Sequence, residues 1–312
     1  MKKMCQIVID LGKTPVMWAD MIAKYPSAAD DLPEETIFID WNYGWEIDKG
    51  GELKKLIEKG YQVWGSPSIR SGPDNWYLTD WAKHFKNQQD FIPYAREAGY
   101  TGIVLTSWST SGIYGYTWDE YYNVLDMEQV RNVYPLSGFR ISLAYYSQAL
   151  KSNSFLSPAS FVMKYGMDRF GLSAKHAALL WESLAQSQQM VYNETELNSQ
   201  QAANTYARRL LSEIKVSRNA KEFDHYILMA DLRAHYLSVL QLEFHYNSES
   251  FTRSNADDIL PKLEQLIENS ILLDKRFFDL NQNFLYESEL EDQSRIRNLL
   301  LHTLYDKIAK VK

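Results

Sequence analysis

The sequence predicts an α/β fold in which strands alternate with helices over residues 1–125, followed by an all-helical domain over residues 126–312. The distribution of turn residues supports this division. All 14 glycines lie at or before Gly171, and eight of the nine prolines lie at or before Pro158. Because glycine and proline mark turns, the first part is expected to be rich in turns. The second part is expected to consist of long uninterrupted elements.

The first part contains four short apolar runs, which we interpret as strands over residues 15–19, 36–41, 62–65 and 102–108. An amphipathic helix is expected over residues 50–60, between the second and third strands. A second helix, over residues 87–100, leads into the fourth strand. Strands that are separated by helices pair in parallel through right-handed crossovers, so the pattern predicts part of a parallel barrel.

The second part contains five helical segments, over residues 174–192, 194–214, 219–246, 256–286 and 288–311. Ser173 and Asn193 stand where the N-caps of the first two helices are expected. Apolar residues recur at spacings of three and four, as in Leu263, Leu266 and Ile267, which is typical of helices that bury one face. No repeat of fixed period is present, so a helical bundle or array is predicted.

Composition excludes several classes of function. A net charge of −7 without any Lys/Arg-rich run argues against nucleic-acid binding. The single cysteine, Cys5, excludes an internal disulfide, and no two of the six histidines stand four residues apart, so no zinc site is expected. No G-x-G-x-x-G or P-loop pattern occurs. We therefore predict neither a metal nor a cofactor.

The amino-terminal residues resemble neither a signal peptide nor a membrane anchor. Asp10 and Gly12 interrupt the apolar run that follows the first lysines, well short of the ~7–15 residues that a signal peptide requires. No run approaches the ~20 apolar residues of a membrane span. We interpret this segment as an amphipathic helix that leads into the first strand. As written, the sequence predicts a soluble, cytoplasmic protein without membrane contact.

All four predicted strands carry a tryptophan at or near their carboxyl ends, namely Trp18, Trp41, Trp64 and Trp108. In a parallel barrel the functional face lies at these strand ends. Indole rings cover the apolar faces of a sugar, and neighbouring polar groups bind its hydroxyls. The pattern therefore predicts a sugar pocket. Alternatively, some of these indoles plug the barrel or pack under helices, which is our interpretation of Trp64, Trp81 and Trp118.

The polar groups that flank these indoles are Asp20, Asn42, Tyr43, Asn75, Ser109 and Thr110. Four segments, "KTPVMWADM", "LPEETIFIDWNYG", "GYQVWGSPS" and "GIVLTSWSTSG", occur in this order. Together they resemble the second half of the catalytic barrel of glycoside hydrolase family 20, the β-N-acetylhexosaminidases, in the branch that carries a helical domain after the barrel. The resemblance implies strands 5–8, the C-terminal half, of a TIM-type (β/α)8 barrel followed by a helical C-terminal domain.

The resemblance also implies a substrate and a mechanism. The substrate would be a glycan with a terminal N-acetylhexosamine, whose own acetamido oxygen attacks the anomeric carbon. The expected substrate-binding residues are Trp18, Asp20, Trp41, Tyr43, Trp76, Tyr77, Trp108 and Thr110. Among them, three tryptophans would wall the acetamido pocket, and Tyr43 or Tyr77 would donate to the acetamido oxygen. Thr110 replaces a carboxylate usual in the family, which implies a different sugar preference or affinity.

The sequence departs from the family at the catalytic residues. The family's adjacent Asp-Glu pair precedes these four strands and has no counterpart here, so no catalytic residue is identified. The candidate pair is Asp119 and Glu120, which fits better as the first turn of a helix. We therefore expect a truncated part of a hexosaminidase-like hydrolase that is inactive alone. The missing half-barrel would be encoded in a preceding reading frame, would have been lost, or would be supplied by a second chain. The alternatives are a non-catalytic carbohydrate-binding or interaction protein derived from the same fold, and an inactive remnant.

Overall fold

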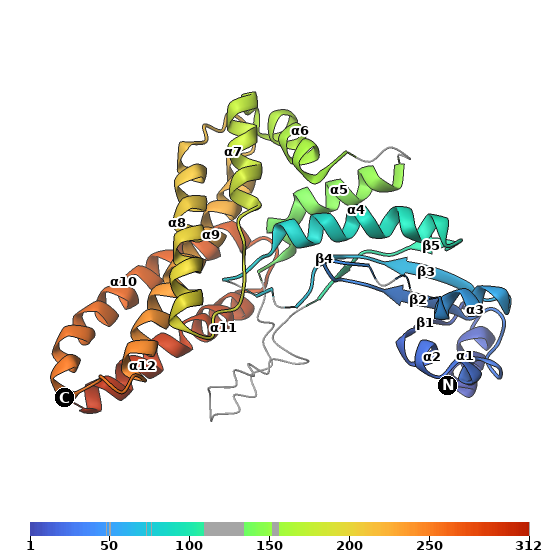
Figure 1. Ribbon diagram of the computed structural model, residues 1–312, viewed down its shortest axis with the longest axis horizontal. Helices are drawn as coiled ribbons and strands as arrows, with labels where there is room; N and C mark the ends of the chain where they lie inside the picture. Colours follow the sequence, from blue (N-terminus) through green and yellow to red (C-terminus); the bar gives the residue numbers. More distant parts are fainter. Residues whose placement is uncertain are drawn as a thin grey trace. The chain divides into compact units, whose positions relative to one another are not determined.

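The computed structural model describes residues 1–47, 49, 51–72, 74, 75, 77–108, 134–151 and 156–311. The chain divides into two compact units (Figure 1). Unit 1 comprises Met1–Ser71, Lys83–Trp108 and Ser142–Pro158, and unit 2 comprises Gly72–Ala82, Ser109–Ile141 and Ala159–Lys312. The domain boundary that the sequence predicts after residue 125 falls within 109–133, outside the described residues.

Unit 1 is built on a parallel sheet of short strands in the order β1-β2-β3-β5 (Figure 1). These strands are β1 (Val16–Trp18), β2 (Ile37–Trp41), β3 (Gln62–Ser66) and β5 (Gly102–Ile103). Phe38 in β2 lies in register with Met17 on one side and with Val63 on the other. The first three predicted strands and their parallel pairing are confirmed.

The prediction of one continuous fourth strand over residues 102–108 was wrong. This segment contains two short strands, β5 and β6 (Thr106–Ser107), and β6 pairs in parallel with an unpredicted strand, β4 (Ser68–Arg70). Pro67 separates β3 from β4, and since proline has no N–H it cannot donate to a strand ladder. It still accepts a 3.1 Å hydrogen bond from the backbone N–H of Thr106, so the chain continues in the same direction across the break.

Unit 1 also contains several helices. They are α1 (Lys2–Asp10), α2 (Asp20–Lys24), α3 (Glu52–Glu58), most of α4 (Trp81–Glu97) and most of α5 (Arg140–Lys151), and a 3-10 turn spans Pro26–Ala29. Cys5 of α1, Ile22 of α2 and Leu56 of α3 share one buried core with Val63 of β3. The amphipathic helix expected before the first strand is confirmed as α1.

Helix α4 covers the same face of β3 as that core. Gly65 lies two residues after Val63, and residues two apart on a strand point to the same face. A Cβ added at Gly65 would lie 2.7 Å from Cε1 of Phe91 and 3.1 Å from the Cβ of Ala95. Glycine is therefore the residue that lets α4 approach this strand closely.

Unit 2 is mostly helical. Its helices are α6 (Pro158–Phe170), α7 (Ala174–Leu184), α8 (Glu194–Glu213), α9 (Ala220–Tyr246), α10 (Ala256–Asn281), α11 (Glu287–Arg297) and α12 (Leu299–Val311), with 3-10 turns at Leu136–Phe139 and Arg253–Asn255. Both predicted N-caps are confirmed. Ser173 Oγ accepts from the N–H of His176 at 3.2 Å, and Asn193 Oδ1 accepts from the N–H of Glu196 at 2.9 Å.

The helix predicted over residues 288–311 is divided at Asn298 into α11 and α12. The amide of Asn298 donates to the backbone oxygen of Ser294 at 3.0 Å and to Oδ2 of Asp274 at 2.7 Å. Such side-chain bonds compete with continuation of the helix. Within the described part of the chain, no helix combines the length and the hydropathy needed to cross a lipid bilayer.

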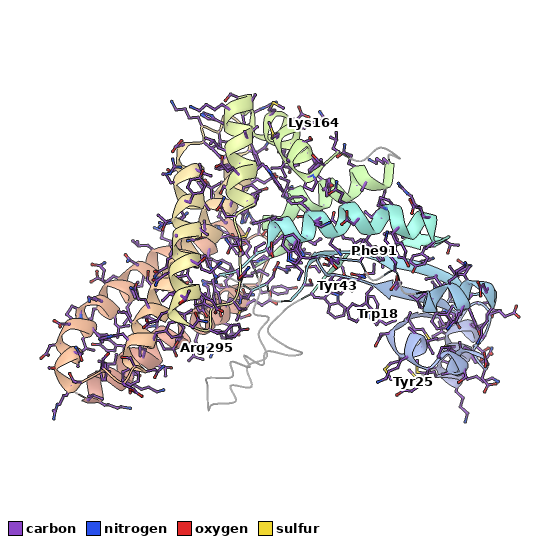
Figure 2. The ribbon with its side chains drawn as sticks, in the orientation of Figure 1. Trp18, Tyr25, Tyr43, Phe91, Lys164 and Arg295 are labelled. Atoms are coloured by element: carbon purple, nitrogen blue, oxygen red, sulfur yellow. The ribbon has the colours of Figure 1, made fainter. Side chains whose placement is uncertain are left out.

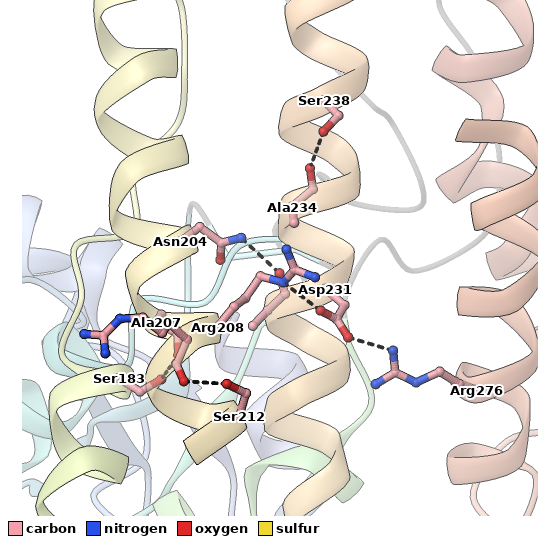
Figure 3. Close-up of polar contacts among 11 residues, drawn as sticks. Ser183, Asn204, Ala207, Arg208, Ser212, Asp231, Ala234, Ser238 and Arg276 are labelled. Atoms are coloured by element: carbon pink, nitrogen blue, oxygen red, sulfur yellow. Dashed lines mark hydrogen bonds and ion pairs between the residues drawn. The ribbon is translucent and has the colours of Figure 1, made fainter. Parts of the chain in front are cut away.

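One carboxylate joins three helices of unit 2 (Figure 3). Asp231 of α9 accepts from Arg208 Nε of α8 and from Arg276 Nη1 of α10, both at 2.7 Å. Close by, the Asn204 amide donates to the backbone oxygen of Ala230 at 3.1 Å (Figure 3). These contacts hold α8 and α10 against opposite sides of α9.

Candidate functional site

Four of the aromatic side chains that the sequence predicts to bind substrate form one continuous cluster in unit 1. Trp18 ends β1, Trp41 ends β2, Tyr43 follows β2, and Trp108 follows β6. Ring centroids lie 5.1 Å apart for Trp41 and Tyr43, 6.3 Å apart for Tyr43 and Trp108, and 5.7 Å apart for Trp108 and Trp18. Figure 2 labels two of the four, Trp18 and Tyr43, beside the strands. We call these four residues the aromatic strip.

The aromatic strip is open to solvent. Trp18, Trp41 and Trp108 are 37%, 45% and 42% exposed, and Tyr43 is partly buried. Tryptophan is on average a highly buried residue, and exposed apolar patches often mark binding surfaces. Exposure of neighbouring indoles at the carboxyl ends of parallel strands is therefore the feature expected of a ligand platform rather than of a core.

A hydrogen bond sets the geometry of the aromatic strip. Trp108 Nε1 donates to the hydroxyl oxygen of Tyr43 at 2.8 Å. Because a phenol both accepts and donates, this contact uses the oxygen of Tyr43 as an acceptor and leaves its O–H proton able to donate to a ligand carbonyl. The backbone N–H of Trp108 also donates to the carbonyl of Arg70 at 3.2 Å, so both ends of this tryptophan are held.

A buried amide that sequence reasoning did not single out supports the loop carrying Tyr43. Asn87 of α4 is fully buried, and its Nδ2 donates to the carbonyls of Asn42 at 2.8 Å and of Gly44 at 3.3 Å. Its Oδ1 accepts from the N–H of Ser68 in β4 at 3.3 Å. The available signal was its position four residues before Phe91, on the helix face that packs against the sheet. Asn87 is therefore a positioning residue for Tyr43.

A buried cation lies next to the strip. Arg70 of β4 is buried, and its Nε donates to Ser107 Oγ in β6 at 2.9 Å. Sequence reasoning did not single out this arginine, because a lone Arg at a short strand carries no local signal of burial. The contact pairs a guanidinium with the residue that directly precedes Trp108.

The carboxylate nearest to Trp41 in sequence is engaged elsewhere. Asp40 accepts a 2.7 Å hydrogen bond from the hydroxyl of Tyr100. The pKa of Tyr100 is raised, mainly because its hydroxyl is buried and secondly because of the negative charge of Asp40. Because successive strand residues point to opposite faces, Asp40 and Trp41 project from opposite faces of β2. Asp40 is thus held away from the aromatic strip.

The remaining sequence-predicted residues are more scattered. Asp20 is exposed in the first turn of α2, two residues after Trp18. Tyr77 belongs to unit 2, where it stacks on Tyr236 with ring centroids 3.6 Å apart and planes 8° apart. Trp76, Thr110, Trp118, Asp119 and Glu120 lie outside the described residues. Trp81 is buried against Phe139, which confirms that it is a packing residue.

Two further pockets lie in unit 2, and Tyr77 lines both of them. Among the described residues, no group of three or more His, Cys, Asp or Glu side chains could hold a metal ion. The aromatic strip is thus the arrangement of described residues best suited to a ligand.

No family model and no curated protein matches this chain. A solved structure described as a GH138 enzyme targeting pectin rhamnogalacturonan II is similar, with a TM-score of 0.52 and 11% sequence identity. The alignment covers 97% of this chain and 57% of that chain, so the present chain spans little more than half of the enzyme's length. At this identity the likeness shows the fold alone: the chain has a glycoside-hydrolase-like fold.

Proposed function

We propose that the aromatic strip is the sugar-binding surface of a β-N-acetylhexosaminidase-like protein and that its ligand is a terminal N-acetylhexosamine. The observation that carries this proposal is the continuous, exposed run of rings at the carboxyl ends of parallel strands. The glycoside-hydrolase-like fold supports it, as does the resemblance of the four strand segments to family 20.

The chemistry of the strip suits an acetamido sugar. Exposed indole faces of Trp41 and Trp108 offer apolar surface to the C–H face of a pyranose and to the acetamido methyl group. The Tyr43 O–H, whose oxygen already accepts from Trp108, is the donor for the acetamido carbonyl. An acetamido group needs both an apolar wall and a donor, and the strip combines them in one place.

In the mechanism that the family resemblance implies, the acetamido oxygen attacks the anomeric carbon. This step needs a carboxylate that orients the acetamido group and an acid that protonates the leaving oxygen. Asp119 and Glu120 are the first candidates in this chain, and a second chain that contributes another half-barrel is the other source. Because a positioned general acid is worth ~10²–10⁴-fold, we expect this chain alone to bind the sugar without hydrolysing it.

The binding test is a titration that follows tryptophan fluorescence. N-acetylglucosamine and its thiazoline analogue should change the emission, whereas glucose, which lacks the acetamido group, should bind more weakly. Trp41→Ala and Trp108→Ala should abolish the response. Trp45→Ala is the matched control, because Trp45 is exposed to a similar extent and lies outside the strip. A folded sample that responds to none of these sugars would contradict the proposal.

The alternative is a non-catalytic carbohydrate-binding or interaction protein derived from the same fold. The engagement of Asp40 by Tyr100, away from the strip, favours it. Release of nitrophenol from nitrophenyl N-acetylglucosaminide by the wild-type chain, lost in Asp119→Asn or Glu120→Gln, would support the hydrolase instead. Because the similar enzyme is described as targeting pectin rhamnogalacturonan II, pectin oligosaccharides are the second ligand to titrate.

A further inference from the structure

An exposed apolar face runs along α1 in unit 1. Met4, Ile7 and Leu11 are 62%, 59% and 72% exposed. Their spacing of three and four places them on one side of the helix, with Leu11 at its C-cap. Cys5 projects from another side and is buried in the core. The helix is thus apolar both toward the core and toward solvent. A helix that only covers a sheet needs an apolar face toward the core alone.

Helix α2 also carries exposed apolar residues. Met21 and Tyr25 stand four residues apart, at α2 and its C-cap, and both are more than half exposed. Helices α1 and α2 pack on the same core through Cys5 and Ile22. Exposed apolar residues that gather in one part of a surface often mark a site of protein interaction. We call these five exposed residues, Met4, Ile7, Leu11, Met21 and Tyr25, the N-terminal face.

Strand addition does not explain the N-terminal face. Among the described strands, β1 pairs only with β2, and Val16 is exposed. However, β1 has three residues and follows Pro15. Short strands and prolines are features that protect a sheet edge against pairing. The surface is therefore suited to packing by a helix rather than to extension of the sheet.

We propose that the N-terminal face binds a second copy of this chain, with the two α1 helices packed antiparallel about a twofold axis. The charges beside the apolar stripe fit this arrangement. Lys3 and Asp10 are both exposed and lie seven residues apart, so they stand roughly 20° apart on the helix near its opposite ends. Antiparallel packing places Lys3 of each copy beside Asp10 of the other, which makes the surface self-complementary, as a twofold contact requires.

The charged residues beside the apolar stripe also fit the edge of a dimer contact. The Lys3 and Asp10 pairs add a polar rim around an apolar centre, which is the usual anatomy of such contacts.

The first test is the mass of the full chain in solution. Sedimentation equilibrium should show a species of twice 36.4 kDa at micromolar concentration. The variant Ile7→Glu/Leu11→Glu should weaken dimerisation on the order of 100-fold, since it places charges at the centre of the contact. Ile271→Glu/Leu272→Glu is the matched control, because these residues of α10 are 64% and 63% exposed. It should leave the mass unchanged.

A chain that stays at 36.4 kDa at every concentration would overturn the proposal, and it is also the result expected if a different protein covers this face. Equal loss of the dimer in the α10 control would overturn it too. Circular dichroism of each variant shows whether the helices are retained. Sugar titration of the monomeric variant should be unchanged, so failure of this inference is distinguishable from failure of the proposed sugar site.

The second test is charge exchange, which addresses the antiparallel arrangement. Lys3→Glu and Asp10→Lys should each weaken the dimer several-fold, because each brings like charges together. The double variant Lys3→Glu/Asp10→Lys should restore it, since opposite charges face each other again. A dimer that the double variant fails to restore would show that the two helices do not pack in this way.

Discussion

Trp108 Nε1 donates a 2.8 Å hydrogen bond to the hydroxyl of Tyr43, a residue 65 positions earlier in the chain. The contact joins the ends of two different strands and leaves the Tyr43 O–H proton as a donor. Tyr43→Phe keeps the ring and removes this donor, together with the acceptor for Trp108 Nε1. We expect the affinity for N-acetylglucosamine to fall about tenfold, as for the loss of one hydrogen bond of about 1.5 kcal/mol.

Fluorescence titration measures the effect of Tyr43→Phe, and glucose serves as a second ligand. Binding of glucose should change less, because glucose has no acetamido carbonyl to accept from Tyr43. Tyr25→Phe is the matched control, since Tyr25 is exposed and lies outside the aromatic strip. Equal losses for both sugars would argue that the Tyr43 hydroxyl acts by holding Trp108 rather than by donating to the acetamido carbonyl.

Because α4 approaches β3 closely at Gly65, adding one methyl group there should destabilise the protein. In Gly65→Ala the new Cβ would lie 2.7 Å from Phe91 Cε1, a buried ring. We expect the free energy of unfolding to fall by about 1–3 kcal/mol, as for other overpacked sites. Gly72→Ala is the control, because no atom of the described residues other than its chain neighbours lies within 4 Å of a Cβ there, and its effect should stay within about 0.5 kcal/mol. Urea unfolding of both variants checks this, and equal midpoints would refute it.

Two aspartates of unit 2 should differ in how much their ion pairs stabilise the protein, because one is more buried than the other. Asp231 is 17% exposed and pairs with Arg208 and Arg276, whereas Asp168 is 65% exposed and pairs with Lys164 one helical turn away. Asp231→Ala leaves two guanidinium groups without their shared carboxylate, and we expect it to destabilise the protein by about 2 kcal/mol. Asp168→Ala should cost at most about 0.5 kcal/mol.

The comparison is made by urea unfolding in low and high salt. High salt should reduce the already small effect of Asp168→Ala more completely than that of Asp231→Ala, since buried pairs are screened less. Equal effects of the two substitutions would show that the three-helix contact in Figure 3 contributes little.

The burial of His225 predicts that the free energy of unfolding falls at acidic pH. His225 is buried on α9, and its Nδ1 shares a 2.6 Å hydrogen bond with the hydroxyl of Tyr134. Burial lowers the pKa of His225 to about 4, although the negative charge of Glu222 opposes the shift. As the pH falls below about 6.5, the unfolded chain therefore binds a proton that the folded chain does not.

The stabilisation from His225 is complete above pH 6.5 and is lost as the pH falls toward 4, a change of about 3 kcal/mol for a shift of this size. His225→Gln removes the titrating group and keeps an acceptor for Tyr134. Its free energy of unfolding should depend less on pH between 6.5 and 4. His235, whose pKa burial also lowers, accounts for a remaining slope. Identical slopes for wild type and variant would contradict this account.

Local patterns in the sequence determined much of the backbone. Glycine and proline positions separated a turn-rich part from a helical part, and the Ser173 and Asn193 caps marked where two helices begin. The tryptophans at strand ends could be read because a strand and the residue that ends it are neighbours in the chain. These features depend on interactions between residues a few positions apart, which a sequence displays directly.

Only the tertiary structure decided which of those side chains meet. It brings Trp18, Trp41, Tyr43 and Trp108 into one strip, places the buried amide of Asn87 under the loop of Tyr43, and stacks Tyr77 on Tyr236 in unit 2. It also divides the fourth predicted strand, because β6 pairs with β4 after Pro67. Each of these contacts joins residues distant in the chain, so it depends on strand register and on the volumes that pack around it. Strand register and packing volume cannot be read from residues that are neighbours in the sequence.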